Sequence, residues 1–186
     1  GGAMFGVVPK SIWKKLNPPD ENNMSNWAMR CMLIEDEGRL ILIDNGMGNK
    51  QDEKFFGYYY LNGDDTLAKS LAKYGFTKDD ITDVFLTHLH FDHCGGSIEK
   101  EGEKLVPAFK NAIYWSNENH WKWATNPNDR EKASFLKENI LPIKESGNLK
   151  YVSHKDGVEF LKNINIRFVN GHTESMMIPQ INYKGK

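Results

Sequence analysis

The stretch FLTHLHFDHCGG, residues 85–96, concentrates side chains that can bind metals or move protons. It contains three of the six histidines in the chain, His88, His90 and His93, together with Asp92. In an extended segment side chains alternate between two faces, so we expect His88, His90 and Asp92 to project to one side. A turn of the chain at His93 would aim a fourth ligand at the same place.

Neutral imidazole and carboxylate groups are the ligands that suit zinc and other borderline divalent cations. Four such groups packed together without a cation would be electrostatically unfavourable. Hydrogen bonds within a loop could satisfy a single histidine, but they account poorly for three histidines beside an aspartate. The spacing therefore predicts a metal site, and Gly95 and Gly96 would let the backbone pass close to it.

The elements around this stretch place further polar side chains at strand ends. Asp44 follows the apolar run 40–43, the strand-like segment 81–87 runs into the histidine cluster, and His172 comes shortly after the strand-like segment 163–169. Loops on a rigid scaffold usually carry function. We therefore expect the three strand ends to supply one site.

The rest of the chain mixes strands and helices. Apolar runs at 28–34 and 40–43, with Gly38 between them, predict a hairpin. Periodicity and capping residues predict helical segments within 64–75, 116–124 and 128–140, the first starting at Asp65 or Thr66 and ending at Gly75. Regular βαβ alternation is missing from this pattern. We therefore predict one layered α/β domain over residues 1–186, with a largely antiparallel sheet.

Composition limits the partners and the compartment. The 24 basic and 25 acidic residues give a net charge of −1, which would attract neither nucleic acid nor an acidic membrane surface. No apolar run is long enough for a membrane span. The expected partner is a small molecule. Two cysteines, Cys31 and Cys94, and an amino terminus without signal-peptide features favour the cytoplasm. Because the chain does not begin with Met, a signal already removed is an alternative.

The motif His88-x-His90-x-Asp92-His93, preceded by a strand and followed by Gly-Gly, resembles the signature of the metallo-β-lactamase superfamily. The segments LILIDNG and VNGHT are similar to that family's strand ending in Asp and to its next metal-ligand motif. The resemblance extends in order over about residues 28–184. It implies a four-layer αββα sandwich with a dinuclear metal site at one edge of the sheets.

The resemblance also implies a role for each polar residue. His88, His90 and His172 would hold the first metal, and Asp92 and His93 would belong to the second. Asp44 would orient a ligand imidazole through its other ring nitrogen. Zinc is the expected metal, with Fe or Mn as alternatives.

The implied activity is that of a metal-dependent hydrolase. A bound metal lowers the pKa of water to about 7, and Asp92 would act in catalysis by orienting the resulting hydroxide toward an ester-like bond. HLHFDHCGG is most similar to the branch that contains N-acyl-homoserine lactonases, so a lactone or related ester is the expected substrate. A glyoxalase-II-like thioester hydrolase, a phosphotriesterase and an RNA-processing nuclease are alternatives, and the balanced charge disfavours the nuclease.

The chain departs from the family pattern after His172. The family adds a bridging aspartate and a later histidine, whereas Glu174 is the only acidic residue that follows here and no histidine does. Residues 176–186 predict a strand whose partner is missing. We therefore expect a partial domain, incomplete at its C-terminus, that binds one zinc or none where the complete protein binds two. Completion by a second chain in a homodimer and a non-catalytic metal-binding remnant are alternatives.

Three further features carry weaker predictions about their roles. Aromatic residues Phe56 and Tyr59, with Phe5 from the amino terminus, would form a wall for an acyl or alkyl group, or else a satellite hydrophobic cluster. His120 is predicted to serve helix packing or the surface rather than a metal. Cys94 is predicted to be a small buried residue without catalytic function.

Overall fold

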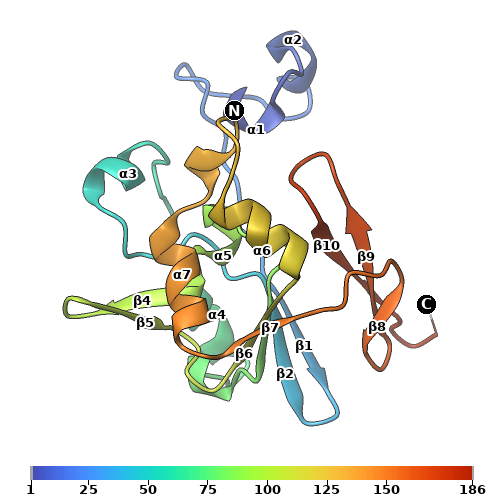
Figure 1. Cartoon of the computed structure of the whole chain (residues 1–186). Helices are drawn as coiled ribbons and strands as arrows, with labels where there is room; N and C mark the ends of the chain where they lie inside the picture. The colour runs from blue at the N-terminus through green and yellow to red at the C-terminus, as the bar shows by residue number, and fades with distance from the viewer. Residues whose placement is uncertain (1, 186) are drawn as a thin grey trace.

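A computed structural model describes residues 2–185 and places a five-stranded sheet at its centre (Figure 1). The strands lie in the order β1-β2-β3-β6-β7. Their bounds are β1 Met32–Asp36, β2 Arg39–Ile43, β3 Asp83–Phe85, β6 Ile113–Ser116 and β7 Leu149–Tyr151. Only the β1–β2 hairpin is antiparallel, and the three other pairings are parallel. The prediction of a largely antiparallel arrangement is therefore wrong for this sheet, because helical connections return the chain to the same end before each later strand.

Two smaller antiparallel sheets complete the strand content of the described residues. The three-stranded sheet has the order β10-β9-β8, with bounds β8 Val158–Leu161, β9 Ile164–Val169 and β10 Met176–Ile181. The two-stranded sheet joins β4 Ile98–Glu101 to β5 Lys104–Pro107. The strand predicted near the carboxyl end is β10, which pairs with β9 along its whole length and lies at the edge of its sheet.

The helices are short. Their bounds are α1 Gly2–Phe5, α2 Lys10–Trp13, α3 Glu53–Gly57, α4 Leu67–Lys73, α5 Phe91–Cys94, α6 Glu118–Thr125 and α7 Lys137–Glu145. The predicted start of α4 is confirmed, because the Thr66 hydroxyl accepts a hydrogen bond from the Lys69 N–H at 3.2 Å. Within residues 2–185, no helix has the length and apolar character needed to cross a bilayer.

Strand β2 shows how the layers are held together. Leu40 and Leu42 face the core shared with the helices, whereas Ile41 and Ile43 face the core shared with the three-stranded sheet, which includes Ile166. Because side chains alternate along a strand, one central strand can supply both cores. The layers are therefore helices, five-stranded sheet and three-stranded sheet, with β8, β9 and β10 to one side of the central sheet in Figure 1.

This arrangement confirms the α/β fold class and forms the first three layers of the expected αββα sandwich. On the outer face of the three-stranded sheet, Val169 and Ile178 are exposed. The helical layer expected over that face is not formed by residues 2–185.

The loop after β2 contacts the histidine segment backbone to backbone. A Cβ atom added to Gly95 would lie 2.1 Å from the Met47 carbonyl oxygen, and one added to Gly96 would lie 2.3 Å from that of Asn45. The Gly96 N–H donates to the Gly46 carbonyl at 2.9 Å. The two glycines thus allow the loop that follows Asp44 to dock directly beside the histidines.

Candidate metal centre

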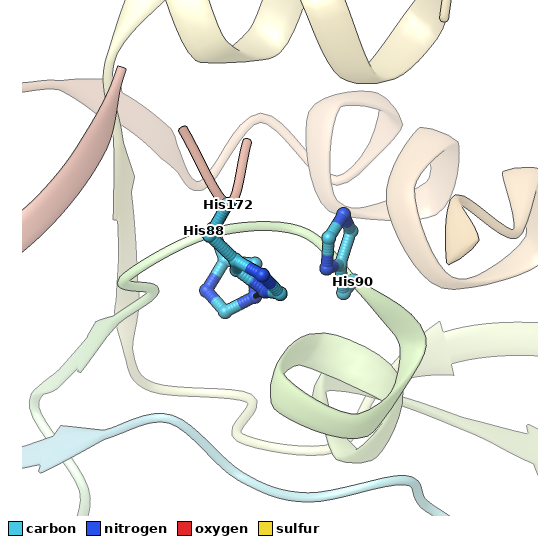
Figure 2. Close-up of side chains that lie close together, drawn as sticks. All are labelled: His88, His90 and His172. Carbon is cyan, nitrogen blue, oxygen red and sulfur yellow. Dashed lines mark hydrogen bonds between the residues drawn. The ribbon is translucent and has the colours of Figure 1, made fainter. Parts of the chain in front are cut away.

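Three histidines from two segments far apart in the sequence converge at one end of the sheets. His88 lies in the loop after β3, His90 occupies the N-cap position of α5 without a side-chain capping bond, and His172 lies in the loop after β9. Their side chains face a common space (Figure 2). One ring nitrogen from each lies within 4.8 Å of the other two. The structure therefore brings together the three residues expected to hold a first metal.

Burial keeps two of these imidazoles neutral. His88 and His90 are 1% and 6% exposed. Burial, with the neighbouring imidazoles acting in the same direction, lowers the pKa of His90 to about 4 and the pKa of His88 still further. A neutral imidazole keeps a lone pair for a ligand, so both residues are in the form that binds a metal at neutral pH.

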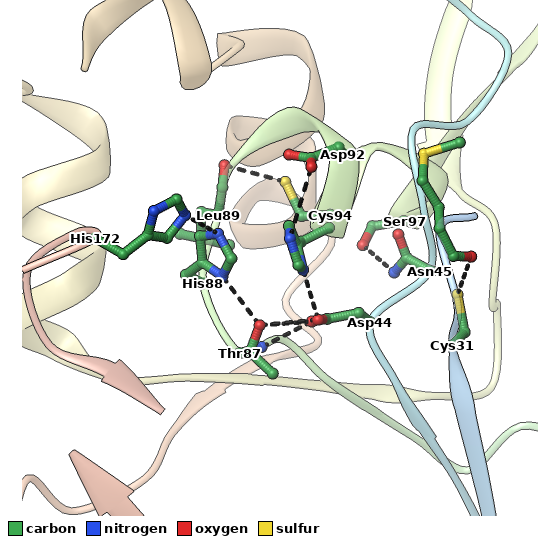
Figure 3. A network of polar contacts seen from close by, with 12 residues as sticks. Cys31, Asp44, Asn45, Thr87, His88, Leu89, Asp92, Cys94, Ser97 and His172 are labelled. Atoms are coloured by element: carbon green, nitrogen blue, oxygen red, sulfur yellow. Dashed lines mark hydrogen bonds and ion pairs between the residues drawn. The ribbon is translucent and has the colours of Figure 1, made fainter. Parts of the chain in front are cut away.

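Hydrogen bonding fixes which nitrogen of His88 carries the proton. The Thr87 hydroxyl lies 2.8 Å from a carboxylate oxygen of Asp44 and 3.0 Å from His88 Nδ1. A carboxylate accepts only, so the single hydroxyl proton goes to Asp44, and Nδ1–H of His88 donates to the hydroxyl oxygen. His88 Nε2 is then unprotonated, and it faces His172 Nε2 at 3.3 Å (Figure 3).

The donor set of the three histidines shows whether the cluster suits a cation. His90 Nε2 is buried and has no hydrogen-bond partner in the described part of the chain. The carboxylate oxygen Oε2 of Glu131 is 3.7 Å away, beyond hydrogen-bonding distance. Each of the three histidines offers one ring nitrogen to the group, and three imidazoles are a donor set that binds zinc and similar divalent cations.

Asp92 and His93 reach the site from a helix. The predicted extended alternation ends at His90, because its carbonyl accepts the N–H groups of His93 and Cys94, each at 3.0 Å, and α5 begins at Phe91. The prediction that Asp92 continues the alternation is therefore wrong. Neither Asp92 nor His93 belongs to the group of three convergent ligands found among the described residues.

Asp44 links the β2 end to His93. It lies in the left-handed region with φ +55°, and its carboxylate accepts the Thr87 N–H at 2.9 Å and His93 Nδ1–H at 2.7 Å. Burial alone would lower the pKa of His93, but the hydrogen bond and charge of Asp44, aided by Asp92, raise it on balance. His93 Nε2 faces the Asp92 carboxylate at 3.6 Å. The hydrogen bond between His93 Nδ1 and Asp44 is the geometry that the expected orienting role of Asp44 requires.

The predicted aromatic wall lies partly beside the site. The rings of Phe55 and Tyr59 pack 5.3 and 5.2 Å from that of Phe91, which belongs to the histidine motif. Burial, with the charge of Asp92, raises the pKa of Tyr59. Phe56 contacts the ring of Phe55 from the far side of this group, at 5.5 Å between centroids.

Phe5 lies in a different aromatic cluster. Its ring stacks on Trp13 at 4.9 Å and lies 5.4 Å from Trp27. The proposed substrate roles of Phe5, Phe56 and Tyr59 stay predictions.

Two residues that contact the ligand segments were not identified from the sequence. Glu131 accepts hydrogen bonds from Thr173 Oγ1 at 2.8 Å and Trp123 Nε1 at 3.0 Å, and so fixes the residue after His172. His120, assigned only to packing or surface, is wholly buried and bonded at both ring nitrogens. Nothing in their local sequence marks the contacts of Glu131 with Thr173 or of His120 with Leu89 and Glu174, because these partners lie in loops more than thirty residues away in the chain.

Comparison with known proteins identifies the family. Residues 29–142 match the sequence profile of the metallo-beta-lactamase superfamily. The chain belongs to this superfamily. The histidine motif and Asp44 both lie inside the matched range.

Among superfamily members of known sequence, this chain is similar to N-acyl homoserine lactonases. The protein from Bacillus thuringiensis is 25% identical over 173 residues, which cover 88% of this chain and 60% of the relative. The protein from Bacillus cereus is 26% identical over the same lengths. The chain thus spans about 60% of the length of these curated relatives.

Solved structures show the same fold. A probable metal-dependent hydrolase from Staphylococcus aureus superposes with a TM-score of 0.84 at 31% identity, covering 96% of this chain and 62% of that one. AidC, described as a dizinc quorum-quenching lactonase, superposes with a TM-score of 0.65 at 24% identity, covering 84% of this chain and 53% of that one.

Proposed function

We propose that the protein is a metal-dependent hydrolase in which His88, His90 and His172 hold the first metal. The observation that carries this proposal is the set of three imidazole nitrogens, one from each histidine, that lie within 4.8 Å of one another. Three protein ligands with one open position are typical of catalytic zinc sites. When bound, such a metal supplies Lewis-acid chemistry and lowers the pKa of water to about 7.

The residues around the three histidines would then orient and hold protons. Thr87 holds His88 through Nδ1, so the ring cannot rotate away from His172. Asp44 holds His93 in the same way, with a charge-assisted hydrogen bond. Asp92 keeps a partly exposed carboxylate beside the cluster, and we propose that it orients the attacking water and belongs, with His93, to a second metal position.

The proposed substrate is a lactone or a related small ester. The lactonase relatives support this choice, and so does an apolar surface formed by Phe55, Tyr59 and Phe91 next to Asp92. Small-molecule sites combine such apolar walls with a few polar groups. A thioester or a phosphotriester would use the same metal chemistry, and a metal-binding module without activity is the alternative outside enzymes.

The test uses the protein expressed from its complete reading frame, loaded with zinc and then stripped with a chelator. Zinc-loaded protein should hydrolyse lactones faster than thioesters or phosphotriesters, and His88→Ala should abolish the activity. His154→Ala is the matched control, because His154 is exposed and its ring packs on Phe168, outside the three-histidine cluster. This variant should retain activity. Inactivity of the loaded wild-type protein on every ester, lactone and thioester would contradict the proposal.

A further inference from the structure

The imidazole of His120 joins the two segments that carry the metal ligands. His120 lies in α6 and is 0% exposed. Its Nε2 accepts the N–H of Leu89 at 2.8 Å, and its Nδ1 lies 2.6 Å from the carbonyl oxygen of Glu174. Leu89 stands between His88 and His90, and Glu174 stands two residues after His172. One side chain therefore connects the two segments that carry the three histidines.

The partners of His120 determine its protonation. A backbone N–H only donates and a carbonyl only accepts, so Nε2 must be unprotonated and Nδ1 must carry the hydrogen. Burial lowers the pKa of His120 to about 4, which keeps this neutral form at physiological pH. Both hydrogen bonds are thus satisfied by a single tautomer.

The same helix makes a second contact with the His172 segment. Asn117, the N-cap of α6, accepts the His120 N–H at 2.9 Å, and its amide nitrogen donates to the Ser175 carbonyl at 2.8 Å. The first turn of α6 therefore bonds two successive carbonyls, those of Glu174 and Ser175. This fixes the helix, and with it the His120 ring, against the loop after β9.

His120 lies too far from the cluster to act as a fourth ligand. Its ring centroid is 6.4 Å from that of His88, and both of its nitrogens are already used. The ring of Phe135 packs 5.9 Å from His120 and 4.7 Å from His90, which closes this side of the cluster with an apolar surface.

We propose that His120 is a positioning residue that sets the spacing between the His88–His90 segment and His172. The role rests on the metal site proposed above and adds a residue to it. Loss of the ring nitrogens would leave the Leu89 N–H and the Glu174 carbonyl without these partners, so the two ligand segments could shift apart. Residues that support metal ligands from outside typically change metal affinity by about 10–100-fold when they are mutated.

Two substitutions in the complete protein separate the effect of the two His120 hydrogen bonds from the effect of its side-chain volume. His120→Phe keeps a buried ring and removes both bonds, so zinc affinity, measured by competition with a chelator, should fall about 10–100-fold. His120→Gln offers one acceptor and one donor, and it should recover most of the affinity. The absorption spectrum of the cobalt-substituted protein should change in the Phe variant and resemble wild type in the Gln variant.

Tyr114→Phe is the matched control. The buried Tyr114 hydroxyl accepts the Phe109 N–H at 3.0 Å and donates to the Ser97 carbonyl at 3.1 Å, so it is also a bridge between backbone groups, but outside the three-histidine segments. This variant should lose thermal stability and keep its zinc affinity. Wild-type zinc affinity and cobalt spectrum in His120→Phe would overturn the proposal, and so would a Gln variant no better than Phe. Failure of the wild-type protein to bind zinc would overturn the metal site itself, and this role with it.

Discussion

The two halves of the histidine cluster differ in how their polar atoms are satisfied. His88, His90 and His172 present ring nitrogens to one another, and two of these imidazoles are kept neutral by burial. His93, by contrast, is bonded to the Asp44 carboxylate and faces that of Asp92, and its pKa is raised. We call the first the convergent half and the second the self-paired half.

This difference shows that one short motif can supply two electrostatic environments. His88 and His90 precede the start of α5, where they are buried under α6 and Phe135. Asp92 and His93 follow it on a helical turn, and their side chains are 27% and 34% exposed. In the convergent half the imidazoles turn one nitrogen each toward the others, which suits a cation, whereas the self-paired half already contains the carboxylates that face its histidine.

The largest expected effect separates the halves by metal affinity. His90→Ala removes a ligand from the convergent half, so affinity for the first zinc should fall by more than about 100-fold, the upper value for residues that only support ligands. His93→Ala should change this affinity by less than about tenfold. Chelator competition with elemental analysis measures both, and equal losses would show that the two halves bind one shared ion.

A smaller effect is expected from the charge of Asp44. Asp44→Asn keeps a residue that tolerates φ +55° and an oxygen for the Thr87 N–H, but it removes the charge beside His93. The pKa of His93 should fall, and the free energy of unfolding should decrease by about 1–2 kcal/mol, the difference between a charge-assisted and a neutral hydrogen bond. An NMR titration of the ring protons in the metal-free protein checks this. An unchanged His93 pKa would assign the raised value to Asp92.

The response of the metal-free protein to pH compares the two halves without a substitution. His88, His90 and His120 have lowered pKa values, about 4 for the last two, against about 6.5 in the unfolded chain. As pH falls through this window the unfolded chain binds protons that the folded protein does not, so stability falls. His93 has the opposite sign, since its contribution is complete below about pH 6.5 and is lost as pH rises through its raised pKa.

Because three groups oppose one, the buried neutral histidines should dominate the pH dependence. The free energy of unfolding should fall on acidification by about 1.4 kcal/mol per pH unit for each net proton taken up. Denaturant titrations at neutral pH and at about pH 5 measure this slope. Stability that increases on acidification over this range would show that the His93 pairing outweighs the buried neutral histidines.

The sequence predicted the elements whose signals are local. The β1–β2 hairpin, the Thr66 cap of α4 and the α6 helix follow from turn residues, capping residues and periodicity, and the structure confirms them. The parallel pairing of β3 with its neighbours was not predicted, because strand direction depends on crossover connections rather than on the strand's own residues.

The candidate site divides in the same way. The convergence of His88 and His90 with His172 could be expected from strand ends and from the family motif. The contacts of Glu131 and His120 could not, since each joins backbone or side-chain groups that lie more than thirty residues away in the chain. The helical placement of Asp92 was missed because the hydrogen bonds that begin α5 at His90 leave no composition signal.

The contact between the loop after β2 and the Gly-Gly pair also limits which residues can occupy positions 95 and 96. Even a methyl group at Gly95 or Gly96 would collide with a backbone oxygen of the facing loop, and backbone cannot rotate away as a side chain can. These two positions take no part in ligand binding, yet they admit no larger residue unless the loops separate. Substitution at these two positions is therefore restricted by backbone packing, independently of the chemistry of the histidines.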